Sequence, residues 1–315
     1  MKIDIIGAGS LGLLLAGMLM NSGCEVRLWC RTEDQAASLA ESGLTVCNVA
    51  GEVQAHLKGE AMSAAPAPLF AAEWLKSPGD WLLLAVKQTV LHSELPDLLM
   101  PLRDITMNIL CLQNGWGHLE MLQSLLPAAS LYAGVTTEGA KRESGVRVIH
   151  AGKGHTYIGR WGEGGGGSLS PESLLAARLE TAGFSASVSN QVETMIFRKL
   201  MINAVINPLT AIWRVSNGEL LASAARIDLM RELYDEAAAV CDAAGIYRED
   251  SLWDDILNVC RATSGNRSSM LADVLASRET EIRWINGALA ELARRTGVDV
   301  PLHRGIIRII EGMIV

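Results

Sequence analysis

The amino-acid sequence predicts an α/β domain with a mostly parallel sheet, extended by antiparallel strands, over residues 1–190, and an all-α domain over residues 191–315. A strand, a glycine-rich turn, a helix and a second strand open the chain. Apolar runs of strand length recur up to residue 188, and helical periodicity follows. A chain of 315 residues is also too long for one ordinary core, so we expect two domains.

Composition narrows the class of protein. Apolar residues make up 49% and charged residues 20% of the chain, as in a well-packed globular protein. The net charge of −8 argues against nucleic acid or an anionic membrane as a partner. The six cysteines form no C-x-x-C pair and no cluster with histidine at zinc spacing, so we expect no metal site and reduced thiols in the cytoplasm. The apolar run at 11–20 is too short to span a bilayer, and no signal peptide is expected.

A buried strand is expected at 2–6, and a glycine-rich motif, G-x-G-x-x-G, follows it and opens a helix. A second strand is expected at 25–30. This order is that of a Rossmann-type dinucleotide site, in which Gly7 permits the tight turn and Gly9 lets the backbone approach a pyrophosphate. Gly12 allows the helix to pack closely on the strand. The N–H groups at the helix N-terminus then face the phosphates. The residues assigned to the cofactor here are Gly7, Gly9, Ser10, Leu11 and Gly12.

The end of the second strand distinguishes the two nicotinamide cofactors. An NAD site places an acidic residue there for the ribose 2′-hydroxyl, whereas this chain has Arg31. A guanidinium can pair with a 2′-phosphate through two hydrogen bonds, so Arg31 favours NADP. The alternative is a surface arginine, with Glu33 or Asp34 in the NAD role.

Two further strands are expected at 81–86 and 106–112, and they end in Lys87 and Asn114. Ligands of open α/β sheets lie at the carboxyl ends of strands, so both side chains are placed to meet cofactor or substrate. Each could instead serve turn chemistry. Three short segments then suggest antiparallel strands that extend the sheet, at 132–136, 146–150 and 155–159, and a strand at 185–188 completes it. The glycine run at 162–168 is expected to be a mobile surface loop.

The helix expected over 198–212 carries Lys199, Asn203 and Asn207 four residues apart, and therefore on one face. The rest of this helix is so apolar that the polar stripe should point into an enclosed site. Desolvation lowers a lysine's pKa towards neutrality, as a general acid requires, and the amides can hold a polar substrate. Pro208 lacks an N–H and leaves the carbonyl of Ala204 without its helical partner, so we expect a kink past Asn207. The alternative is a buried helix whose lysine extends to solvent.

Other helices are expected around 226–244, at 254–263, and as a last long helix at 281–296 that ends at Gly297 with Pro301 beyond. Thr280 should cap this last helix and place Glu281 in its first turn. Ser268 and Ser269 offer hydroxyls for a carboxylate, although either could simply cap a helix.

Taken together, these residues resemble the 2-dehydropantoate 2-reductase (ketopantoate reductase) family along essentially the whole chain. The similarity rests on the glycine motif at 7–12, Val86-Lys87, Gln113-Asn114-Gly115, Lys199-Leu200 with Asn203, the run at 206–211, Asn217-Gly218-Glu219, the segment 268–271, Thr280-Glu281-Ile282 and Ile285-Asn286-Gly287. The resemblance implies an NADPH-dependent oxidoreductase of pantothenate (coenzyme A) biosynthesis with a Rossmann domain and a helical domain.

The same resemblance implies a role for individual residues. Lys199 would be the general acid and Glu281 its partner; Asn114 and Lys87 would lie beside nicotinamide and substrate, and Arg31 would bind the 2′-phosphate. The substrate would be held by Asn114, Asn203, Asn207, Asn217 and Ser269. The chain departs from the family pattern after Glu281, where Arg283 and Trp284 replace the usual acidic residue and tyrosine.

Three alternatives stay open at this point. A different branched 2-keto acid could be the substrate, or the protein could be an NADPH-binding sensor without chemistry, although Lys199, Asn203, Ser269 and Glu281 are all present. A related hydroxyacid or polyol-phosphate dehydrogenase is a third option, but no basic cluster for a phosphate accompanies Lys199 beyond Arg198. The oligomeric state is open, with a homodimer among the states allowed.

Overall fold

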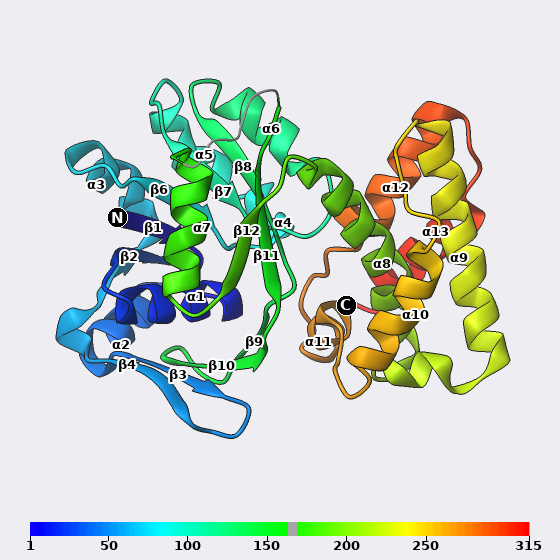
Figure 1. The fold of residues 1–315 in the computed structure, drawn as a ribbon, viewed down its shortest axis with the longest axis horizontal. Coiled ribbons are helices and arrows are strands. Elements are labelled where there is room, and N and C mark those ends of the chain that lie inside the picture. Colours follow the sequence, from blue (N-terminus) through cyan, green and yellow to red (C-terminus); the bar gives the residue numbers. More distant parts are fainter. Residues whose placement is uncertain (163–168, 315) are drawn as a thin grey trace. The chain divides into compact units, whose positions relative to one another are not determined.

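The computed structural model describes residues 1–162 and 169–314 (Figure 1). The expected glycine loop lies almost wholly outside these residues. The chain forms two compact units, one of residues 1–113 and 118–192, the other of residues 114–117 and 193–315. The main division therefore falls between Val192 and Glu193, and a four-residue loop from the first half of the chain groups with the second unit.

An eight-stranded sheet forms the centre of the first unit, in the order β12-β11-β8-β7-β6-β1-β2-β5. Its strands are β1 Lys2–Ile6, β2 Glu25–Cys30, β5 Ser63–Pro66, β6 Trp81–Leu84, β7 Asn108–Cys111, β8 Ser130–Thr136, β11 His155–Arg160 and β12 Ser185–Val188. In this sheet, as far as the structure describes it, neighbouring strands pair in parallel except β8 and β11, which pair antiparallel. The predicted mostly parallel sheet is confirmed. Residues 132–136 and 155–159 pair antiparallel with each other in β8 and β11, as predicted, although β8 also runs parallel to β7 on its other side.

A second sheet of four strands was not predicted. Its order is β4-β3-β10-β9, with β3 Leu44–Asn48, β4 Val53–Leu57, β9 Gly139–Arg142 and β10 Arg147–Gly152. Residues 146–150 were expected to extend the first sheet, but β10 pairs with β3 and β9 instead. The physical reason lies in helix α1, which is apolar on several sides and is covered by this second sheet.

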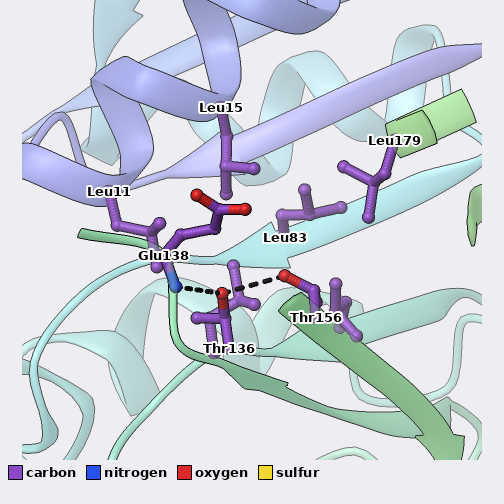
Figure 2. A pocket seen from close by; sticks show the side chains of 9 residues that line it. Leu11, Leu15, Leu83, Thr136, Glu138, Thr156 and Leu179 are labelled. Carbon is purple, nitrogen blue, oxygen red and sulfur yellow. Dashed lines mark hydrogen bonds between the residues drawn. The ribbon is translucent and has the colours of Figure 1, made fainter. Parts of the chain in front are cut away.

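The helices of the first unit are α1 Ser10–Asn21, α2 Glu33–Ser42, α3 Phe70–Lys76, α4 Gln88–Leu91, α5 Leu95–Leu99, α6 His118–Leu125 and α7 Pro171–Thr181, with 3-10 turns at Gly59–Ala61, Ala67–Leu69 and Met100–Leu102. Leucines of α1 and α7 line one small pocket together with leucines of β6 and β7, so both helices lie on the same face of the sheet (Figure 2). Helix α1 packs so closely on the second sheet that a side chain at Gly17 would overlap Val46.

The second unit is helical, as predicted. It consists of α8 Val192–Trp213, α9 Ala224–Ala243, α10 Leu252–Ala262, α11 Ser269–Leu275, α12 Ile282–Thr296 and α13 Pro301–Gly312, with a 3-10 turn at Gly218–Ala222. Helix α12 ends at Gly297 in a left-handed conformation, as predicted, but it is not the last helix. Pro301 begins α13, because a proline at the first helical position loses no hydrogen bond.

Much of helix α8 is buried in the core of the helical unit. Its buried side chains include Leu200, Met201, Val205, Ile206 and Leu209. Among the described helices it alone is long and apolar enough to span a membrane, yet 72% of its most apolar stretch is buried within the protein. Burial of this kind is the arrangement of a core helix.

Candidate functional site

The glycine-rich loop has the geometry that a dinucleotide requires. Gly7 has φ +109°, a conformation that side chains disfavour, and a side chain at Gly12 would overlap the carbonyl oxygen of Gly7. Gly9 is different, because no described atom lies within 4 Å of the position that its side chain would take. Open space in front of Gly9, at the start of α1, fits the approach of a pyrophosphate to the helix N-terminus.

A cavity of about 140 Å³ begins beside this loop. Gly7 and Trp29 line it together with apolar side chains from the ends of β1 and β6 and from α4 and α5, and the exposed Arg31 borders it. Glu94 lines the same cavity, which is otherwise apolar. A largely apolar cavity with a guanidinium at its edge fits an adenine ring with a neighbouring phosphate. The predicted positions of the loop and of Arg31 are thus brought together around one cavity.

Gln35 also contacts the glycine loop, and sequence reasoning missed it. Its side-chain nitrogen donates to the carbonyl of Ala8 at 2.9 Å and to that of Gly145 at 3.3 Å. The sequence around Gln35 suggests a different role, because Thr32 caps α2 and Gln35 lies three residues after it, a spacing typical of a capping box. The amide instead ties the glycine loop to the β9–β10 turn, and the N–H of Arg142 donates to Ser10 Oγ at 3.2 Å.

The ends of β6 and β7 are tied to each other by Gln113. Its side-chain nitrogen donates to the carbonyls of Leu84 at 2.8 Å and Val86 at 3.0 Å. Lys87 comes next in the chain, is partly buried and lies at the N-cap position of α4. Gln113 therefore fixes the backbone that presents Lys87.

A buried carboxylate lies beneath α1 as well. Glu138 points into the leucine-lined pocket of Figure 2, and its Oε2 lies 2.6 Å from His150 Nε2. The side chains of both residues are almost fully buried. The N–H of Glu138 donates to Thr136 Oγ1, which also accepts from Thr156.

The loop 114–117 packs on the first turn of α12. The N–H of Trp116 donates to the carbonyl of Trp284 at 3.1 Å, and the rings of Trp116 and Phe197 lie 4.2 Å apart. Gly115 has φ +91°, and a side chain there would overlap the same Trp284 carbonyl. The two residues on either side of Gly115 are thereby held against the helical unit.

This packing brings Asn114 to Glu281. The Asn114 side-chain nitrogen lies 3.5 Å from Glu281 Oε2, and Glu281 is only 7% exposed. Helix α12 begins at Ile282, one residue later than predicted, so Glu281 itself occupies the capping position. Thr280 Oγ1 still accepts from the N–H of Ile282 at 3.5 Å, which places the threonine next to the helix start without making it the cap.

The charge of Glu281 also acts on Lys199. Burial lowers the pKa of the Lys199 ammonium from 10.5 to about 8, and the negative charge of Glu281 acts in the opposite direction. Farther along α8, Asn203 is partly buried and Asn207 is 6% exposed. Asn207 is therefore buried, whereas Lys199 and Asn203 at the N-terminal end of the stripe are only partly buried, and the pKa of Lys199 lies closer to neutrality than that of an ordinary lysine.

The C-terminal end of the stripe meets α11. Thr210 Oγ1 donates to the carbonyl of Asn207 at 2.8 Å and lies 2.7 Å from Ser268 Oγ. Ser268 accepts from the N–H of Leu271 and caps α11, so the capping alternative is right for this serine. Ser269 follows as the first residue of α11 and is exposed.

Asn217 has structural partners of its own. Its side-chain nitrogen donates to Thr263 Oγ1 at 2.8 Å, and its backbone N–H donates to the carbonyl of Asn266. These bonds join the 3-10 turn to the end of α10. The structure places Asn217 in this junction, and its role toward a substrate stays a prediction.

Comparison with protein families accounts for nearly the whole chain. Residues 3–163 match the model described as ketopantoate reductase PanE/ApbA, and residues 191–313 match that of the ketopantoate reductase PanE/ApbA C terminal. The chain is 33% identical over 312 residues to the 2-dehydropantoate 2-reductase of Shigella flexneri, a match that covers 99% of this chain and 94% of the relative. It is 31% identical to that of Archaeoglobus fulgidus, over 99% of this chain and 97% of the relative.

Solved structures show the same architecture. A ketopantoate reductase of this family from Ralstonia eutropha JMP134 is similar with a TM-score of 0.87 at 26% identity, over 99% of this chain and 98% of the other. A probable 2-dehydropantoate 2-reductase from Bacillus subtilis gives 0.79 at 31% identity, over 99% and 100%. The ternary structure of a D-mandelate dehydrogenase with NADH and anilino(oxo)acetate gives 0.85 at 25% identity, over 99% and 98%.

Proposed function

Because the chain belongs to the ketopantoate reductase PanE/ApbA family, we propose that it reduces 2-dehydropantoate to pantoate with NADPH. The observation that carries this proposal is the group formed by Lys199, Glu281 and Asn114. It combines a lysine of lowered pKa, a buried carboxylate and an amide, which suits the reduction of a ketone next to a carboxylate.

NADP is the cofactor we propose, since Arg31 lies at the edge of the cavity beside the glycine loop. A guanidinium there favours a 2′-phosphate over a 2′-hydroxyl. The residues proposed to hold the cofactor are Gly7, Gly9, Ser10, Leu11, Gly12, Arg31, Lys87 and Asn114. When bound, the nicotinamide supplies the hydride that reduces the C2 carbonyl.

Lys199 supplies the proton in this proposal. Its pKa of about 8 leaves most of the ammonium protonated at pH 7, and a partly desolvated ammonium is a stronger acid than a lysine in water. Negative charge that develops on the C2 oxygen is neutralised as the N–H proton moves to that oxygen, and the neutral amine then regains a proton from water. Glu281 keeps positive charge on the lysine before the reaction by raising its pKa.

The remaining polar residues would hold the substrate. We assign the two amides of α8, Asn203 and Asn207, to its hydroxyl and keto groups, and Ser269 at the start of α11 to its carboxylate, with Asn217 as a further contact. The product would enter pantothenate and coenzyme A synthesis. The proposed compartment is the cytoplasm, which suits the six cysteines because all of them are free thiols.

The test is NADPH oxidation followed at 340 nm with 2-dehydropantoate, 2-ketoisovalerate, pyruvate and benzoylformate, for the wild type and Lys199→Ala. We expect the highest kcat/KM with 2-dehydropantoate and a loss on the order of a hundredfold or more in the variant. Arg198→Ala is the matched control, because Arg198 is exposed and pairs with Asp255. Tight NADPH binding without turnover of any keto acid would contradict the reductase and favour a sensor.

A second candidate is the reduction of a different 2-keto acid. Two observations favour testing it: Trp284 stands beside the Asn114 loop where the family usually has a tyrosine, and a similar solved structure is a D-mandelate dehydrogenase. A higher kcat/KM with benzoylformate or 2-ketoisovalerate than with 2-dehydropantoate would support this candidate.

A further inference from the structure

Helix α8 contains a proline, Pro208, directly after Asn207, the last residue of the polar stripe. Pro208 has no N–H, so the carbonyl of Ala204, one turn earlier, loses the donor that a regular helix would give it. The structure supplies a replacement from another helix. The side-chain nitrogen of Asn286 on α12 donates to the Ala204 carbonyl at 2.8 Å, and Asn286 is fully buried.

His303 on α13 orients this amide. Its Nε2 lies 3.1 Å from the carbonyl of Leu233, which can only accept, so Nε2 carries the proton and Nδ1 is an acceptor. Nδ1 lies 3.0 Å from the Asn286 side-chain nitrogen and accepts its second hydrogen. Burial lowers the pKa of His303 to about 4, so the ring stays neutral and this acceptor persists at physiological pH.

The Ala204 carbonyl that accepts from Asn286 lies between two residues of the polar stripe, Asn203 and Asn207. Ala204 follows Asn203 directly, and Pro208 follows Asn207 directly, so the turn that lacks its own hydrogen bond is the turn that separates these two amides. Without the Asn286 donor this turn would have a buried, unsatisfied carbonyl, and α8 could relieve it by opening or bending there. Asn207 would then shift relative to Asn203 and Lys199, which both lie before this turn.

We propose that Asn286, oriented by His303, is a positioning residue that holds the proline turn of α8 closed and so fixes the two substrate amides at the spacing that the reaction needs. The proposal rests on the proposed function. Asn286 belongs to a sequence motif, Ile285-Asn286-Gly287, that the site itself does not use, and this role gives the motif a physical purpose. The effect passes through the helix, since Asn286 bonds the backbone of Ala204 rather than the substrate amides themselves.

The test is a cycle of Asn286→Ala, Pro208→Ala and the double variant. Asn286→Ala should lower kcat/KM for the keto acid on the order of tenfold to a hundredfold, mainly by raising KM, as expected for misplaced binding groups. The Kd for NADPH should stay unchanged. Pro208→Ala returns an N–H that can donate to the Ala204 carbonyl, so the double variant should recover most of the lost kcat/KM, and Pro208→Ala alone should be close to wild type.

A purely structural role of Asn286 predicts a different pattern. In that case Asn286→Ala would lower the melting temperature without raising KM, or the returned N–H would not restore kcat/KM, and either result overturns the proposal. Should Asn286→Ala not fold, His303→Ala replaces it, because that variant keeps the Asn286 donor and removes the acceptor that orients it, together with the bond to the Leu233 carbonyl. A raised KM that Pro208→Ala reverses is expected there too, and an unchanged KM overturns the proposal.

Hydrogen exchange separates this proposal from the proposed function. Amide exchange over residues 199–212 should be faster in Asn286→Ala than in the wild type, and Pro208→Ala should reverse the change. This measurement needs no turnover. If the wild type reduces no keto acid, the proposed function fails while exchange still decides whether Asn286 closes the turn; equal exchange in wild type and Asn286→Ala overturns the positioning role.

Discussion

The lowered pKa of Lys199 predicts the pH dependence of the reaction. With a pKa of about 8, about nine-tenths of the lysine is protonated at pH 7 and about one-tenth at pH 9. If the protonated lysine is the acid, kcat/KM should fall roughly tenfold between these pH values and then about tenfold per pH unit. The measurement is kcat/KM for the keto acid from pH 6 to 10 at saturating NADPH.

Glu281→Gln then tests the direction of the electrostatic effect. The Glu281 charge raises the pKa of Lys199, so its removal should lower that pKa. The fall of kcat/KM at alkaline pH, here called the alkaline limb, should then move to lower pH. Glutamine keeps a side-chain oxygen for Asn114, which limits the change to the charge. Glu193→Gln is the control, because Glu193 is an exposed acid in the first turn of α8, the helix that carries Lys199. The alkaline fall of kcat/KM in this variant should match that of the wild type.

Two results would refute this reasoning. An alkaline limb of the wild type near pH 10 would mean that the lysine is not desolvated during catalysis. A limb that stays in place or moves to higher pH in Glu281→Gln would mean that the carboxylate does not control the lysine's charge.

Three other perturbations follow from the first unit. Gly9→Ala should fold normally but weaken NADPH binding, whereas the added side chain of Gly12→Ala would overlap the Gly7 carbonyl and should lower the melting temperature as well. Cofactor titration and thermal unfolding of both variants are the measurements, and equal melting temperatures of the two variants would contradict the packing argument. Arg31→Ala should raise the Kd for NADPH by roughly ten- to a hundredfold and leave NADH nearly unchanged, and an equal loss for both would exclude a 2′-phosphate contact. Glu138→Gln removes the charge from the buried hydrogen bond with His150 and should cost about 1–3 kcal/mol of unfolding free energy in urea titration. No loss of unfolding free energy would mean that the charge of Glu138 does not strengthen this bond.

The parts of the fold that follow from local sequence were predictable. The glycine spacing and the apolar runs at β1 and β2 located both strands to the residue, because adjacent turn and strand signals agree there. The polar stripe of α8 was predictable for the same reason, since the periodicity of a helix is a local property.

The partners of each element were not predictable in this way. β10 has the pattern of a strand, but nothing within it says that β3 is its neighbour; that depends on which surfaces α1 leaves apolar. Gln35 shows the same limit at the site, because a capping-box spacing cannot reveal that the Ala8 carbonyl lies nearer. The partner that Asn286 provides for Ala204 is also beyond local reasoning, since 82 residues separate the two.

The four residues 114–117 have a consequence for how the protein can be divided. The chain passes from one compact unit to the other after Gln113, after Gly117 and after Val192. A fragment that starts at Glu193 would therefore lack Asn114 and would leave the carbonyl of Trp284 without the Trp116 N–H. A chimera of two relatives joined only after Val192 would combine the helices of one parent with the loop of the other. Exchange of the helical unit as a working module requires two separate pieces of sequence, and the shorter of them lies inside the cofactor-binding half of the chain.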